Sequence, residues 1–343
     1  MRRRILIALL LLAALVAFTA VRGDRRAAGE AAASQPEQQL AGGIRRLDLR
    51  FPCGDSACAG WLFLPPTGGT PPVVVMGHGF AGTRDVALPL FAERFARDGI
   101  AAFAFDYRHF GASGGAPRQV VDPRTQLEDW RAALAFVRAR PEVDGAKVAA
   151  WGTSMGGGHA LLVAAGDPEL RAVVAQAPLI DTDLEGNAGF QGVAWAARLV
   201  LTGWTDLVWS AFGGDPVTAP AIAPRGTFGM IVDDAAYAAF EKLVVSGSTY
   251  RNAVAMRSPF NFHGYNPAAK THAIRAPVLL IASPTDRFAP FEAARAYAAR
   301  SPTVTLETFD GDHFDVYSPP AATRAGDLAA AFLASRLKTT GGS

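Results

Sequence analysis

Apolar residues follow two alternating patterns along most of the chain. Short apolar runs bounded by Gly and Pro predict buried strands, and longer segments with an apolar residue every three or four positions predict amphipathic helices. Strands are predicted at 47–51, 59–64, 72–76, 100–105, 147–151, 170–176, 277–282 and 303–309. Helices are predicted at 85–98, 123–140, 155–165, 291–299 and 321–337. This order predicts an α/β fold, with a doubly wound and mostly parallel sheet that begins with an antiparallel hairpin.

The alternation starts near residue 44 and is interrupted once. Residues 44–182 and 275–338 form the predicted α/β core. Residues 183–274 lack clear strand runs and hold many aromatic residues among helical patterns, so they predict a helical cap inserted before the penultimate strand. These aromatic residues suit an apolar substrate pocket and equally the packed interior of a helical subdomain.

The first 43 residues depart from this pattern. Three arginines precede the uncharged run 5–21, and this combination is typical of an export signal. The run is slightly shorter than the roughly 20 residues that span a bilayer, and an uncleaved N-terminal membrane anchor at 1–21 is the alternative. Residues 22–43 have no apolar period and predict a flexible linker. We therefore expect a secreted or periplasmic protein that is either free or anchored at its N-terminus.

Composition narrows the classes of function. The chain has 343 residues, of which 50% are hydrophobic, which is enough for one large α/β domain with an insertion. The formal net charge is +2 and no long basic run occurs, so nucleic-acid binding is not indicated. Nothing in the sequence fixes the oligomeric state.

The two cysteines, Cys53 and Cys58, flank a turn-like tetrapeptide between the first two predicted strands. In an exported protein this spacing predicts a disulfide that closes a hairpin, with two free thiols as the alternative. Two thiols without a nearby histidine do not complete a zinc site. We expect no metal and no organic cofactor.

The sequence Gly-Thr-Ser-Met-Gly around Ser154 follows a predicted strand and opens a predicted helix. This is the setting of a nucleophile elbow, a strained turn that exposes the serine hydroxyl at the N-terminus of a helix. Gly152 and Gly156 are expected there because the strand and helix backbones approach closely. Ser154 is therefore the candidate nucleophile.

Backbone N–H groups for an oxyanion are expected from two loops. One belongs to Met155, the residue after the nucleophile, and the other to Phe80, in the Gly-His-Gly-Phe segment after the third predicted strand. His78 lies in the same segment and is expected to be structural, with a role as catalytic base as the alternative.

The acid and base are expected after the last two strands. In the chain order Ser, Asp, His, the acid is Asp286 and the base is His313. Asp181, after the preceding strand, is the alternative acid. Structural or pocket-lining roles are expected for the other candidate histidines: His159, His263 and His272.

Together these residues resemble the α/β-hydrolase superfamily over about residues 45–338. The Gly-His-Gly-Phe segment, the segment 106–115 and the Asp286 segment are similar to bacterial esterases related to dienelactone hydrolases and prolyl-oligopeptidase-type domains. Such relatives usually carry Gly where this chain has His109. The Asp106-Tyr107-Arg108 segment is expected to be structural, with a buried Asp–Arg arrangement that braces the loop beside the nucleophile.

The candidate triad implies a serine hydrolase, and its expected partner is a small-molecule carboxylic ester. His313 would take the proton of Ser154, an acyl-enzyme would form, and water would release the acid. Two other functions are kept open: an exported serine peptidase of the prolyl-oligopeptidase type and a non-catalytic binding protein on the same fold. A cofactor-free haloperoxidase or a C–C bond hydrolase would use the same triad.

Overall fold

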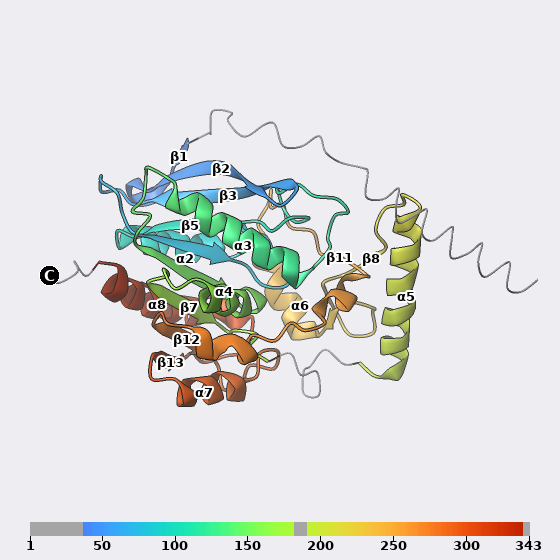
Figure 1. Ribbon diagram of the computed structural model, residues 1–343. Coiled ribbons are helices and arrows are strands. Elements are labelled where there is room, and N and C mark those ends of the chain that lie inside the picture. Colours follow the sequence, from blue (N-terminus) through green and yellow to red (C-terminus); the bar gives the residue numbers. More distant parts are fainter. Residues whose placement is uncertain (1–36, 182–190, 339–343) are drawn as a thin grey trace, which may run out of the picture.

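The computed structural model describes residues 37–181 and 191–338 (Figure 1). The predicted signal segment 1–21, most of the predicted linker and the start of the predicted cap lie outside the described residues. A nine-stranded sheet forms the centre, in the order β1-β2-β3-β5-β4-β6-β7-β12-β13. Its strands are β1 (Glu37–Gln39), β2 (Arg45–Cys53), β3 (Ser56–Leu64), β4 (Val73–Gly77), β5 (Ala101–Phe105), β6 (Val148–Thr153), β7 (Ala172–Gln176), β12 (Val278–Ala282) and β13 (Val304–Thr308).

The sheet is antiparallel at one side and parallel over the rest. β1, β2 and β3 pair antiparallel, β3 joins β5 antiparallel, and all pairs from β5 to β13 are parallel. Every residue of β4, β5, β6, β7 and β12 is buried. Such strands need apolar side chains on both faces, which explains their uninterrupted apolar runs. The predicted fold class is confirmed.

Helices cover both faces of the sheet (Figure 1). α2 (Leu88–Arg97) and α8 (Ala321–Leu337) pack together on one face. The other face carries α3 (Pro123–Arg138), α4 (Met155–Gly166) and α7 (Phe291–Arg300). The connections β6–α4, β12–α7 and the segment after β13 all leave from the carboxyl ends of parallel strands, so they meet at one edge of the sheet.

Part of the predicted linker is ordered. Residues 37–39 form β1, which pairs antiparallel with β2, and the 3-10 helix η1 (Ala41–Gly43) follows. All three side chains of β1 are exposed, so the strand is held by backbone hydrogen bonds and leaves no apolar pattern in the sequence. The flexible linker predicted for 22–43 is therefore wrong for its last seven residues.

Between β7 and β12, the described residues form two α-helices and two small sheets. The helices are α5 (Val193–Ala211) and α6 (Asp234–Glu241), followed by the 3-10 helices η2 (Ser258–Phe262) and η3 (Ala268–Ala273). The sheets pair β8 (Thr218–Ala219) with β11 (Val254–Ala255) and β9 (Ile222–Ala223) with β10 (Ile231–Val232). The segment contains the helices that the sequence predicts. It also contains strands too short to produce an alternating pattern.

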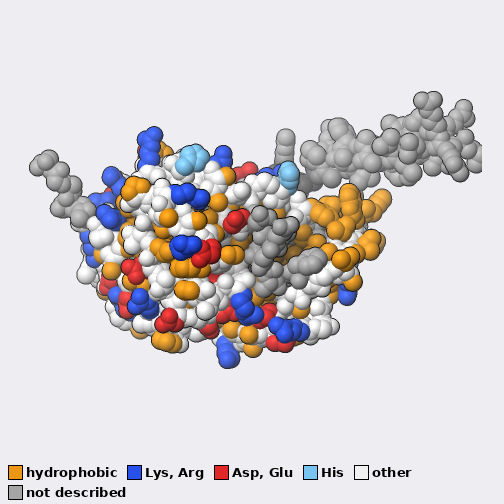
Figure 2. All heavy atoms as spheres, turned by 90° about the horizontal axis from the view of Figure 1, so that it is seen from below, with side chains coloured by type: hydrophobic (Ala, Val, Ile, Leu, Met, Phe, Trp, Pro, Cys, Tyr) orange, Lys and Arg blue, Asp and Glu red, His pale blue; other side chains and the backbone are white. Residues whose placement is uncertain are grey.

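α5 lies at the periphery and turns apolar side chains outward. The hydrophobic patch on the right of Figure 2 lies over this helix. The exposed apolar residues of α5 and its C-terminal end are Val193, Val200, Leu201, Trp204, Val208, Trp209 and Phe212. In the described part of the chain, no helix combines the length and the apolarity needed to cross a bilayer.

The predicted disulfide is present. Cys53 and Cys58 are bonded across the turn between β2 and β3. The Asp129 carboxylate lies within 4.8 Å of both sulfur atoms. Because the sulfurs are bonded to each other, they offer no thiolates to a metal ion.

Candidate active site

Ser154 occupies the turn between β6 and α4 in a backbone conformation that is rare for a residue with a side chain, with φ 56° and ψ −124°. Its N–H donates to the carbonyl oxygen of Gln176 on β7 at 2.8 Å. A Cβ on Gly152 would lie 2.0 Å from the carbonyl oxygen of Gly156, and a Cβ on Gly156 would lie 2.4 Å from that of His78. Only glycine fits at either position, and the strained turn presents the Ser154 hydroxyl at the start of α4.

The three residues predicted as a triad lie in one hydrogen-bonded chain. The Nε2 atom of His313 is 3.0 Å from Oγ of Ser154, and its Nδ1 atom is 2.7 Å from Oδ2 of Asp286. The side chains of His313 and Asp286 are almost fully buried. With Nδ1–H donating to the carboxylate, Nε2 is left to accept the serine proton. Asp286 is therefore the acid that contacts Nδ1 of His313, the role for which Asp181 was the alternative candidate.

Asp286 is fixed by its own loop. Its second oxygen, Oδ1, accepts the backbone N–H groups of Phe288 at 2.8 Å and Ala289 at 2.7 Å. The ring of Phe288 packs edge-to-face against the imidazole of His313, with centroids 5.7 Å apart. The carboxylate therefore has one oxygen for the loop and one for the imidazole.

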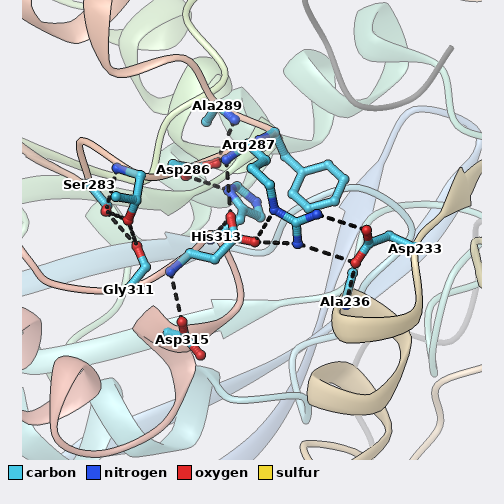
Figure 3. A network of polar contacts seen from close by, with 12 residues as sticks. Asp233, Ala236, Ser283, Asp286, Arg287, Ala289, Gly311, His313 and Asp315 are labelled. Carbon is cyan, nitrogen blue, oxygen red and sulfur yellow. Dashed lines mark hydrogen bonds and ion pairs between the residues drawn. The ribbon is translucent and has the colours of Figure 1, made fainter.

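The loop that carries Asp286 is tied to the loop that carries His313 (Figure 3). The hydroxyls of Ser283 and Thr285 both donate to the carbonyl oxygen of Gly311. The two loops are also joined by the side chain of Arg287, which contacts Asp312, the residue before His313. The sequence analysis did not identify Arg287 as a functional residue, although its position directly after the predicted acid could have indicated it.

The two residues predicted for an oxyanion site lie on either side of the nucleophile. Met155 is the first residue of α4, so its N–H has no acceptor within the helix, and the helix N-terminus favours an anion. A Cβ on Gly79 would lie 3.0 Å from Cβ of Ser154, which puts the backbone just before Phe80 against the nucleophile. The Phe80 ring faces Phe262 of the segment between β7 and β12, with centroids 6.4 Å apart.

His78 and His159 are buried beside the site, as expected for structural histidines. Nδ1 of His78 lies 2.9 Å from the carbonyl oxygen of Gly79, and burial lowers the pKa of this imidazole. His159 contacts Gln126 through Nε2 at 3.0 Å and the Tyr265 hydroxyl through Nδ1 at 2.9 Å. Burial lowers its pKa to about 3. Both are therefore neutral at pH 7.

Asp106 and Arg108 are both buried, as predicted, and each forms an ion pair with another residue. Asp106 pairs with Arg84, whose guanidinium contacts Oδ2 and whose N–H donates to Oδ1 at 2.7 Å. Arg108 pairs with Asp129 of α3, through Nε at 2.6 Å and through its own N–H at 2.9 Å. Each buried carboxylate thus accepts hydrogen bonds from both the guanidinium and the backbone N–H of one arginine, and both hydrogen bonds are charge-assisted.

The chain is similar to a known protein family and to several known proteins. The family model described as serine aminopeptidase, S33, matches residues 70–313. The chain is 39% identical over 280 residues to the quorum-quenching protein AidA of Acinetobacter baumannii (strain MDR-ZJ06), covering 81% of this chain and 91% of the relative. It is 38% identical over 122 residues to the thiohydrolase aneE of Aspergillus aculeatus, covering 36% of this chain and 38% of the relative.

A solved structure agrees at the level of the fold. The α/β hydrolase GrgF from Penicillium sp. sh18 matches with a TM-score of 0.73 and 24% sequence identity, covering 86% of this chain and 99% of that chain. The match of the family model over residues 70–313 and the 39% identity to AidA over 81% of the chain show the family, and the fold shared with GrgF agrees with them. The chain belongs to the S33 family of α/β hydrolases.

Proposed function

We propose that this protein is an exported serine hydrolase that cleaves carboxylic esters, with Ser154, Asp286 and His313 as its catalytic triad. The observation that carries the proposal is the hydrogen-bonded chain through the imidazole, with contacts of 2.7 and 3.0 Å. A strained serine at a helix N-terminus, a buried imidazole and a fixed carboxylate suit nucleophilic acyl transfer.

In the proposed reaction, Nε2 of His313 removes the proton of Ser154 as Oγ attacks the ester carbonyl carbon. The N–H groups of Phe80 and Met155 stabilise the oxyanion of the tetrahedral intermediate. The imidazolium, balanced by Asp286, returns the proton to the leaving alkoxide, and an acyl-enzyme remains. His313 then deprotonates water, which attacks the acyl carbon and releases the acid and the Ser154 hydroxyl.

Two features support export. The N-terminal segment 1–21 has the charge and hydropathy pattern of a signal or anchor. The Cys53–Cys58 disulfide is a bond that persists in oxidising compartments.

A serine peptidase is the second candidate, favoured by the description of the matching family as a serine aminopeptidase. A substrate with a free amino group needs an unpaired acid near the nucleophile. Asp233 reaches toward the site from α6, but Arg287 already neutralises it through two contacts of 2.8 and 3.2 Å. Asp233 is therefore not available to bind the charged amino end of a peptide.

Turnover of a substrate panel by the chain from residue 34 tests the proposal. The panel contains p-nitrophenyl esters of increasing chain length, aminoacyl p-nitroanilides, a lactone and a thioester. Similarity to a quorum-quenching protein is the reason for the lactone, the cyclic form of an ester, and similarity to a thiohydrolase is the reason for the thioester. We expect ester turnover, and we expect Ser154→Ala to lower kcat by about 10⁴-fold or more.

Three other outcomes would contradict the proposal. Amide cleavage that depends on Ser154, with weak ester turnover, would favour the peptidase. Turnover that survives in Ser154→Ala would remove this serine as the nucleophile. A complete lack of turnover on the panel would contradict the proposed ester cleavage and favour an enzyme of narrow specificity or a binding protein on the same fold.

A further inference from the structure

Arg287 lies between the two loops of the candidate triad and the segment that contains α6 (Figure 3). It directly follows Asp286, and its guanidinium contacts Asp233 twice, with Nη1 2.8 Å from Oδ2 and Nη2 3.2 Å from Oδ1. Its backbone N–H and its Nε donate to Asp312, at 3.0 and 2.5 Å. Asp312 immediately precedes His313. One side chain therefore bridges three segments that are distant in sequence.

Asp233 fixes the start of α6. It is 5% exposed, and its Oδ1 accepts the N–H of Ala236 at 2.9 Å, which makes it the N-cap of the helix. Hydrogen bonds from Arg287 are the main cause that lowers the pKa of Asp233, to about 2, so the carboxylate stays charged at neutral pH. The position of α6 is thereby tied to the loop that carries the acid.

Asp312 holds the backbone of the candidate base. Its Oδ1 accepts the N–H of His313 at 2.8 Å, and its own N–H donates to Asp315 at 2.7 Å. Burial, the largest influence, by itself raises the pKa of Asp312, but hydrogen bonds from Arg287 and His313 outweigh it and the pKa lies below the ordinary value. The turn that presents the imidazole therefore depends on an anion whose charge Arg287 balances.

We propose that Arg287 is a positioning residue that aligns His313 with Ser154 and couples this alignment to the placement of α6. The inference rests on the proposed function, because it needs His313 to be the base. A guanidinium suits the task, since its planar fork binds two carboxylates in fixed directions and a lysine ammonium does not. A displacement of a catalytic group by about 1 Å costs on the order of a hundredfold in rate, so turnover reports on this bridge.

The first experiment compares Arg287→Ala, Arg287→Lys and the control Arg295→Ala in the full chain with a p-nitrophenyl ester. Arg295 is an exposed arginine of α7 that pairs with Glu292. We expect Arg287→Ala to lower kcat about ten- to a hundredfold. Arg287→Lys is expected to lower it less, because the positive charge remains, and the control is expected to match the unsubstituted protein.

The pH profile separates positioning from a general loss of folded protein. The charged groups around the imidazole are Asp286 at Nδ1, Asp312 and Asp315 in its own loop, and Arg287. Removal of the guanidinium takes a positive charge away from this set and leaves the negative charge of Asp312 unbalanced. We expect the acidic limb of kcat/KM in Arg287→Ala to move to higher pH, by about half a unit or more. A purely structural loss leaves the limb in place.

Asp233→Asn tests the coupling to α6. Asparagine is also a good N-cap, so the helix keeps its first hydrogen bond while the ion pair is lost. We expect KM to rise about two- to fivefold, in line with the loss of a partly exposed ion pair. The acidic limb is expected not to move to higher pH. In the double variant with Arg287→Ala, the loss in kcat/KM is expected to be smaller than the product of the single losses, because both changes remove one bridge.

Labelling of Ser154 by a fluorophosphonate distinguishes the two ways in which the inference can fail. Unsubstituted protein with neither turnover nor labelling contradicts the proposed function, and the role of Arg287 falls with it. An active unsubstituted protein and an Arg287→Ala variant with the same kcat and pH profile would overturn this inference alone. Losses that multiply in the double variant would overturn the coupling to α6. If Arg287→Ala does not fold, an unchanged kcat in Arg287→Lys together with an unchanged KM in Asp233→Asn would overturn the inference.

Discussion

Ser154 and His109 both have a positive φ, of 56° and 74°, which is rare for residues other than glycine. At Ser154 the conformation has a chemical consequence, because it turns the hydroxyl out of the strand and toward His313. At His109 it explains a difference in sequence. Similar esterases usually carry glycine there, and glycine adopts positive φ without steric cost. The sequence shows that His109 departs from the resemblance, and only the backbone angle shows why glycine is common at that position.

Gly156→Ala is expected to impair both stability and turnover. A Cβ there would lie 2.4 and 2.5 Å from the carbonyl oxygens of His78 and Gly77, backbone atoms that cannot move without shifting the end of β4. We expect the free energy of unfolding to fall by about 2 kcal/mol or more in urea titrations. Gly166→Ala is the matched control, since a Cβ there meets no atom within 4 Å and alanine favours the helix. Equal losses in both variants would contradict the steric explanation.

His159 is expected to make the protein less stable in acid. Burial lowers its pKa from 6.5 to about 3 in the folded chain. Between these values the unfolded chain binds the proton and the folded chain does not, so stability falls as the pH falls from about 6.5 toward 3. The slope contributed is at most about 1.4 kcal/mol per pH unit. His159→Gln is expected to flatten this part of a Tm–pH curve, and an unchanged slope would contradict the assignment.

Asp129 acts in the opposite direction over part of this range. Burial raises its pKa to about 6, so the folded chain binds this proton more tightly than the unfolded chain does. Its contribution to stability grows as the pH falls from about 6 toward 3.8. Because Asp129 is present in both proteins, comparison of His159→Gln with the unsubstituted chain isolates the histidine.

At the scale of elements, local backbone geometry decides the boundaries that the hydrophobic pattern leaves open. The helix predicted from residue 85 begins at Leu88, because Ala87 has φ 63° and a proline lies in the first turn. The helix predicted at 321–337 has those bounds, since nothing interrupts its apolar period. The strands β1 and β8 to β11 could not be predicted from the sequence. They have only two or three residues each, so their position is set by hydrogen bonds to the partner strand and not by a hydrophobic pattern.

A buried carboxylate of α5, that of Asp206, contributes to the attachment of this helix to the segment around it. Asp206 is fully buried, while the opposite face of the helix exposes apolar side chains. It accepts the N–H of Val217 at 2.7 Å and the Nε–H of Arg257 at 2.7 Å. Asp206→Asn is expected to cost about 3 to 5 kcal/mol, because it leaves the Arg257 guanidinium without its buried counter-ion.

Hydrogen exchange of the α5 amides measures this effect where it arises. Leu201→Gln is the control, since this side chain is 68% exposed and its replacement is expected to change stability by less than about 0.5 kcal/mol. Protection of α5 that is the same in Asp206→Asn and in the control would show that the carboxylate does not anchor the helix.

At the scale of the whole molecule, the parallel sheet explains why the candidate triad could be predicted. Residues that follow the carboxyl ends of β6, β12 and β13 meet at one edge of the sheet, so chain order and strand positions suffice for Ser154, Asp286 and His313. The pairing of Arg287 with Asp233 was beyond sequence reasoning. Its partners are 54 residues apart, and the placement of α6 over the core brings them together.

The state of Cys53 and Cys58 tests the proposed export of the whole protein. A disulfide across so short a loop is expected to stabilise the fold by about 2 kcal/mol. We expect full-length protein to reach an oxidising compartment without free thiols, and protein lacking residues 1–21 to stay in the reducing cytoplasm with two thiols and a lower urea midpoint. In the double variant Cys53→Ser, Cys58→Ser the two preparations should have the same urea midpoint.

Full-length protein that stays in the cytoplasm with both thiols free would contradict export. Exported protein with free thiols would instead contradict the disulfide.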